Sequence, residues 1–132
     1  MKIGLDIMGG DYAPHSNLHG ALLASKQLST DEKIVLIGDS NVAKEILQQN
    51  NAELSLFEFI HADDQIAMNE HATKAIRKKP NNSISVGFEA LKNGEIDVFS
   101  SAGNSGAMLV GSMFSVCLLY TSDAADDPGS GG

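Results

Sequence analysis

Short apolar runs alternate with stretches of helical spacing along most of this chain, and this alternation limits the folds that it can adopt. The apolar runs lie at residues 2–7, 33–37, 54–60 and 96–99. Neighbouring parallel strands need a long connection, and a helix supplies it. We therefore predict an α/β fold with a mainly parallel sheet flanked by helices.

Residues that favour helix ends bound the stretches between the apolar runs. Ser16 suits the N-cap of the first helix, and Asn82 or Ser83 suits that of a later one. Pro80 stops the stretch before it. The helices predicted in this way cover residues 16–27, 42–47, 68–76, 83–92 and 107–114, the last with the length of a buried helix.

The composition excludes several classes of protein. The net charge is −8, so the overall field repels nucleic acid and we predict no nucleic-acid partner. The lone cysteine, Cys117, offers neither a disulfide partner nor a metal-binding spacing. The longest apolar run, near residues 107–110, is far shorter than the roughly 20 residues of a membrane-spanning helix. Since residues 1–6 do not resemble a secretory signal, we expect a cytoplasmic protein.

Two glycine-bearing turns follow predicted strands and are the strongest candidates for a binding site. In open α/β sheets, ligands bind beyond the carboxyl ends of the strands, and the backbone N–H groups at a helix N-terminus bind anions. Asp6 and Asp11, at the first turn, are candidate bases or hydrogen-bond acceptors. The candidate ligand-binding residues are Gly9, Gly10 and Asp11 in the first turn and Ser101, Gly103, Asn104, Ser105 and Gly106 in the second.

Each candidate also has a purely structural interpretation. The second turn lacks both the lysine of a P-loop and the spacing of a dinucleotide fingerprint, so an ordinary capped turn also explains it. An aspartate such as Asp11 more often caps the backbone of a turn. Lys74, Arg77 and Lys78 can share one helix face and bind a phosphate or an acidic partner, but most such clusters are merely solvated.

Three motifs, taken in order, resemble those of the PlsX-type phosphate acyltransferases. The family opens with Asp-Ala-Met-Gly-Gly-Asp and a proline, and residues 6–11 match this with one isoleucine for alanine, followed by Pro14. The family motif Ser-Ala-Gly-Asn-Thr-Gly-Ala appears at residues 101–107 with Ser105 for threonine. A middle motif, Met-x-x-x-Pro-x-Lys-Ala-x-Arg-x-Lys, is matched by Met68, Lys74, Ala75, Arg77 and Lys79, with Ala72 in place of proline.

This resemblance implies an enzyme of bacterial phospholipid synthesis that makes acyl phosphate from fatty acyl-acyl-carrier-protein and inorganic phosphate. It also implies a fold similar to isopropylmalate dehydrogenases and phosphotransacetylases, a homodimer, and peripheral contact with the membrane. No metal or cofactor is required, because phosphate supplies its own nucleophile. The implied contacts with phosphate, the oxyanion or the carrier protein come from the two turns and from Lys74 and Arg77, and no catalytic acid or base is assigned.

The chain departs from this family in its length and at its end. The family chain is well over twice as long, so we expect an incomplete fold. Residues 1–116 match the N-terminal part of the α/β domain, whereas residues 117–132 have the composition of a linker and are expected to form a disordered or artefactual tail. The alternatives are a truncated fragment without catalytic activity, a phosphotransacetylase, and a nucleotide-binding domain, which the absence of a G-x-G-x-x-G turn disfavours.

Overall fold

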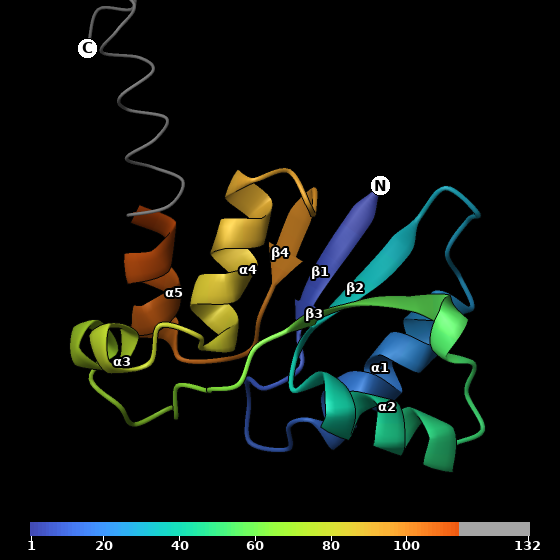
Figure 1. Ribbon diagram of the computed structural model, residues 1–132, viewed down its shortest axis with the longest axis horizontal. Coiled ribbons are helices and arrows are strands. Elements are labelled where there is room, and N and C mark those ends of the chain that lie inside the picture. Colours follow the sequence, from blue (N-terminus) through green and yellow to red (C-terminus); the bar gives the residue numbers. More distant parts are fainter. Residues whose placement is uncertain (114–132) are drawn as a thin grey trace, which may run out of the picture.

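A computed structural model describes residues 1–113 of the chain, which form a four-stranded sheet with helices on both faces (Figure 1). The strands pair in parallel in the order β3-β2-β1-β4, which confirms the predicted α/β fold. The elements are β1 (Lys2–Asp6), α1 (His15–Ser25), β2 (Lys33–Gly38), α2 (Ser40–Gln49), the 3₁₀-helix η1 (Leu54–Leu56), β3 (Phe57–His61), α3 (Ala72–Lys78), α4 (Ser83–Lys92), β4 (Val98–Ser100) and α5 (Ser105–Ser112).

Successive residues of β2 point to opposite faces of the sheet and belong to two separate cores. Ile34 and Leu36 pack into the core shared with α1 and α2, while Val35 and Ile37 pack into the core shared with α4. All four side chains are buried. The continuous apolar run of this strand therefore reflects a parallel sheet that is covered on both faces. Burial of each such side chain contributes roughly 1.5–3 kcal/mol before entropic costs.

The helices α3, α4 and α5 form the layer on the face of the sheet opposite α1 and α2. α4 lies over the sheet, α5 lies beside α4, and α3 packs against α5 (Figure 1). α4 approaches β4 closely at Gly87, where an added Cβ would lie 2.2 Å from the ring of Phe99. That ring also meets Phe88 edge to face, with 5.2 Å between the centroids. This packing fixes the position of β4, whose end leads into the second glycine turn.

Two local predictions near chain connections are wrong. Residues 54–56 were expected to begin a strand, but they form η1, and β3 starts at Phe57. Their apolar residues alternate imperfectly, and Leu54 turns back to pack on the core beneath α1 and α2. Ser16 is not an N-cap, because α1 already begins at His15 after Pro14. A proline fits the start of a helix, since its missing N–H would have no intrahelical partner there.

The last predicted helix is present but is not a buried one. α5 buries Ala107 and Gly111, whereas Leu109 is 63% exposed. The predicted end of this helix at residue 114 and the predicted tail at residues 117–132 lie outside the described residues. Within residues 1–113, no helix has both the length and the apolar character that crossing a membrane requires.

Candidate functional site

The two glycine turns meet at the carboxyl end of the sheet. An added Cβ on Gly9 would lie 2.6 Å from the backbone nitrogen of Gly103, so the two backbones are in direct contact. Gly10 has a φ of 100°, in the region that favours glycine, and faces Ala102. The pairing of β1 with β4 explains the contact, because it places the ends of both strands side by side. The turns therefore form one structural unit, as the topology predicted.

A buried aspartate joins the turns. Asp6, at the end of β1, is 1% exposed, and its carboxylate accepts hydrogen bonds from the Met8 N–H at 2.8 Å and from the Ser101 hydroxyl at 2.7 Å. The Ser101 oxygen in turn accepts a bond from the Gly103 N–H at 3.0 Å. Asp6 is thus the hydrogen-bond acceptor that the sequence indicated. The Ser101 proton and the Gly103 N–H are already used within the protein.

Asn17 adds a second tie that the sequence did not signal. Its side-chain amide nitrogen donates to the carbonyl oxygens of Asp6 at 3.0 Å and Gly9 at 2.9 Å. It reaches them from α1, so the helix holds the backbone of the first turn.

The predicted ligand-binding residue Asp11 is exposed, and its carboxylate makes no hydrogen bond within the described part of the chain.

Free backbone donors remain at the start of α5. The Asn104 side chain caps this helix by accepting a bond from the Ala107 N–H at 2.9 Å. Among residues 1–113, the N–H groups of Ser105 and Gly106 have no hydrogen-bond partner, and Ser105 also has an exposed, unpaired hydroxyl. Such donors at a helix N-terminus attract anions, because the helix dipole adds to their partial positive charge.

The amide nitrogen of Asn104 is not free to bind a ligand. It lies within hydrogen-bonding distance of three carbonyl oxygens, those of Ala67 at 2.9 Å, Glu70 at 3.0 Å and Met68 at 3.3 Å. Asn104 is only 4% exposed. An asparagine amide has two N–H groups, and here both are occupied by the backbone.

The predicted basic residues divide into free and paired ones. Lys74, Arg77 and Lys78 are exposed on α3 and form no ion pair in the described residues. Lys79 instead donates to the Glu70 carboxylate at 2.7 Å and to the carbonyl oxygen of Gln65 at 3.0 Å. The helix that carries the free cations packs against α5, where an added Cβ on Gly106 would lie 3.0 Å from the Cβ of α3's first residue, Ala72.

Lys79 is the main cause of the lowered pKa of the Glu70 carboxyl. Its hydrogen bond, aided by one from the Ala67 N–H at 2.9 Å, holds the pKa of the Glu70 carboxyl below its ordinary value of 4.5. This contact therefore stabilises the fold above pH 4.5 and is lost as the pH falls through the lower folded-state pKa.

Lys79→Met should raise the pKa of Glu70 towards 4.5 in a carbon-detected NMR titration. Lys92→Met, at an exposed helix end, should leave the pKa unchanged; an unmoved pKa in the first variant contradicts the assignment.

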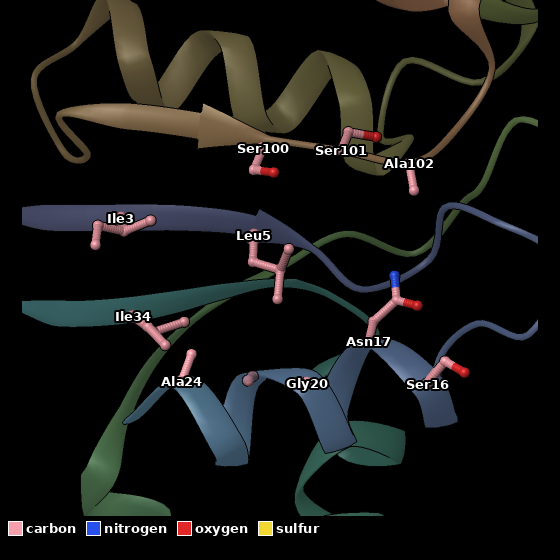
Figure 2. Close-up of a pocket in the computed structure, with 11 residues that line it drawn as sticks. Ile3, Leu5, Ser16, Asn17, Gly20, Ala24, Ile34, Ser100, Ser101 and Ala102 are labelled. Carbon is pink, nitrogen blue, oxygen red and sulfur yellow. The ribbon is translucent and has the colours of Figure 1, made fainter. Parts of the chain in front are cut away.

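An open trough runs beside the turns, along the sheet face next to α1 (Figure 2). Its volume is about 430 Å³. Ile3, Ile34 and Ala24 line one end, and Asn17 and Ser101 lie at the other, where the trough meets the turns. The trough is therefore apolar along its floor and polar at the candidate site.

No group of three His, Cys, Asp or Glu side chains among residues 1–113 is arranged to hold a metal ion. Within these residues, the unpaired polar groups near the start of α5 include the Ser105 and Gly106 N–H groups and the Ser105 hydroxyl, and α3 carries the exposed cations.

Comparisons with known proteins agree in pointing to one family. A family model described as "Fatty acid synthesis protein" matches residues 1–123. Proteins named phosphate acyltransferase are 41% identical in Caldicellulosiruptor bescii over 116 residues, 41% in Dictyoglomus turgidum over 120, and 37% in Herpetosiphon aurantiacus over 115. These matches cover 88%, 91% and 86% of this chain and 34%, 34% and 30% of the respective relatives. The chain thus spans about a third of the length of these relatives.

Proposed function

This chain belongs to the fatty acid synthesis protein family, and from that premise we propose that it is the phosphate-binding part of a phosphate acyltransferase. The reaction forms acyl phosphate from a fatty acyl-acyl-carrier-protein and inorganic phosphate. The observation that carries the proposal is the pair of joined glycine turns, beside which the Ser105 and Gly106 N–H groups are free to bind an anion.

The proposed reaction requires mainly that the protein position the two reactants and stabilise the negative charge that develops. A phosphate oxygen attacks the thioester carbonyl carbon, a tetrahedral oxyanion forms, and the carbon–sulfur bond then breaks so that the carrier thiolate leaves. The free N–H groups at α5 suit the phosphate or the oxyanion, since fixed donors stabilise such charge without reorganisation. Lys74 and Arg77 screen the repulsion between the anionic reactants or contact the acidic carrier protein. Holding the two reactants together supplies much of the remaining acceleration.

The family assignment supports a proposal about the wider setting of this activity. We propose that residues 1–116 are the N-terminal part of a longer α/β enzyme that works as a homodimer in the cytoplasm, in peripheral contact with the membrane. Because this chain spans about a third of its relatives, we expect the 132 residues to bind phosphate without full turnover.

Phosphate titration of the isotopically labelled chain tests the site. We expect the NMR signals of the Ser105 and Gly106 amides to shift saturably at millimolar phosphate. Ser105→Pro removes one free N–H at the first helical position, where proline is tolerated. The Asn104 backbone before it, at φ −58° and ψ 116°, is not in the α region that a following proline disfavours. This variant should weaken binding about tenfold.

Two comparisons complete the test. The matched variant Ser105→Ala removes the hydroxyl alone, so it separates the backbone donor from the side chain and should weaken binding less than Ser105→Pro. Unmoved amide signals in the wild-type chain contradict the proposed site. A full-length relative that forms acyl phosphate from acetyl-coenzyme A but not from a long-chain acyl-acyl-carrier-protein would instead support a phosphotransacetylase.

A further inference from the structure

We propose that Asn104 is a positioning residue that clasps residues 65–79 against the second glycine turn and so holds the cationic helix α3 beside the phosphate site. This inference rests on the proposed phosphate site for its functional meaning. The clasp itself is a property of the contacts, and it assigns the Asn104 side chain a role other than binding phosphate.

The two ends of the Asn104 amide serve two different elements. Its oxygen caps α5 at the Ala107 N–H, and its nitrogen donates to carbonyl oxygens between Ala67 and Glu70. These carbonyls belong to the segment that leads directly into α3, which begins at Ala72. One buried side chain therefore fixes both the helix with the free N–H groups and the segment that carries the free cations.

The opposite end of the segment is also tied. Lys79, directly after α3, donates to the Gln65 carbonyl and to the Glu70 carboxylate, and Glu70 also accepts from the Ala67 N–H. The segment is thus closed on itself by Lys79 and attached to the turn by Asn104. Within the described residues, these contacts leave the charged groups of Lys74, Arg77 and Lys78 unpaired and facing solvent.

The close approach of α3 and α5 makes the arrangement sensitive to this clasp. Ala72 lies against Gly106, whose N–H is one of the free donors, so movement of the segment changes the distance between the cations and the helix N-terminus. An anion bound at the N-terminus of α5 is attracted both by the free N–H groups and by the net positive charge of α3. Releasing the clasp should weaken phosphate binding although every protein group proposed to contact the phosphate remains in the chain.

The variant Asn104→Ser separates the clasp from the cap. Serine is a good N-cap but is too short to reach the carbonyls at residues 67–70. We expect hydrogen exchange at residues 65–79 to become faster by about tenfold or more, while the amides of α5 stay protected. Lys79→Met provides a second route, because it opens the same segment from its other end without touching the turn.

A double-mutant cycle reports on positioning rather than stability. In the wild-type chain, the paired substitution Lys74→Gln and Arg77→Gln should weaken phosphate binding about tenfold, because it removes two cations near the anion. In the Asn104→Ser background the same pair should have less than about threefold effect, because the helix is no longer held in place. If the Asn104 side chain instead bound phosphate directly, Asn104→Ser and the paired substitution would weaken binding independently, and their fold-changes would multiply.

The outcomes separate the two proposals. Unchanged exchange at residues 65–79 in both Asn104→Ser and Lys79→Met overturns the clasp, and multiplicative effects in the cycle overturn the positioning role. If the wild-type amides of Ser105 and Gly106 do not respond to phosphate, the proposed phosphate site fails, while the exchange measurement still decides whether the clasp exists.

Discussion

Gly9→Ala should lower the stability of this chain by about 3 kcal/mol and abolish measurable phosphate binding. The new methyl group would lie 2.6 Å from the backbone nitrogen and 2.7 Å from the Cα of Gly103. These are backbone atoms, so no side-chain rotation can relieve the overlap and the two turns must separate. In thermal unfolding followed by circular dichroism, the expected fall in Tm is roughly 10–20 °C for a domain of this size.

Gly20→Ala is the matched control for this prediction. Gly20 lies on α1 at the trough, and an added Cβ there meets no atom within 4 Å. The same change of one methyl group should stabilise the helix by about 0.8–1 kcal/mol, because alanine has the higher helix propensity. If Gly9→Ala unfolds at the wild-type temperature, the direct contact between the turns is contradicted.

Asp6→Asn should cost about 2 kcal/mol in the free energy of unfolding, although the two side chains have nearly the same shape. The carboxylate accepts the Ser101 proton, whereas an amide nitrogen in its place offers a second donor to an oxygen that already accepts from the Gly103 N–H. The strong bond to a charged acceptor is lost, and the tie between β1 and the second turn with it. Chemical denaturation monitored by circular dichroism measures this loss.

Ser101→Ala and the double variant test whether these two groups act as a pair. Ser101→Ala leaves one carboxylate oxygen buried without that donor, so a similar cost is expected. The double variant should cost less than the two single changes added together, with a coupling of about 1–2 kcal/mol. Asp11→Asn, at an exposed aspartate of the same motif, should change stability by less than about 0.5 kcal/mol. Additive costs at Asp6 and Ser101 would contradict the bond.

Local rules predicted much of the fold. The periodicity of apolar residues identified the parallel strands and their helices, since a strand buried on both faces, such as β2, has a continuous apolar run. Asn82 was one of two residues predicted to begin α4, and its side chain does accept the Ser85 N–H at 2.8 Å. This cap depends on residues three positions apart, which explains why a local rule found it.

The candidate site could be located but not detailed. The rule for parallel sheets places both turns at the same edge, but it says nothing about which polar groups meet there. The bond between Ser101 and Asp6 depends on the register in which Leu5 pairs with Ser100, and the Asn104 amide contacts carbonyls 34 to 37 residues earlier. Such contacts follow from tertiary packing, so the sequence alone showed which residue types could bind an anion and not which donors were already used.

The position of β4 next to β1 has a consequence for the kinetics of folding. β1, one of the two inner strands, comes first in the chain, but its neighbour β4 lies more than 90 residues later. The hydrogen bond between Asp6 and Ser101 spans 95 residues. Closing so long a loop costs conformational entropy before the contacts repay it, and high contact order slows folding. β2 can pair early with β1, and β3 with β2, whereas the two glycine turns can meet only after the chain has emerged as far as α5. The proposed site is therefore a late product of folding.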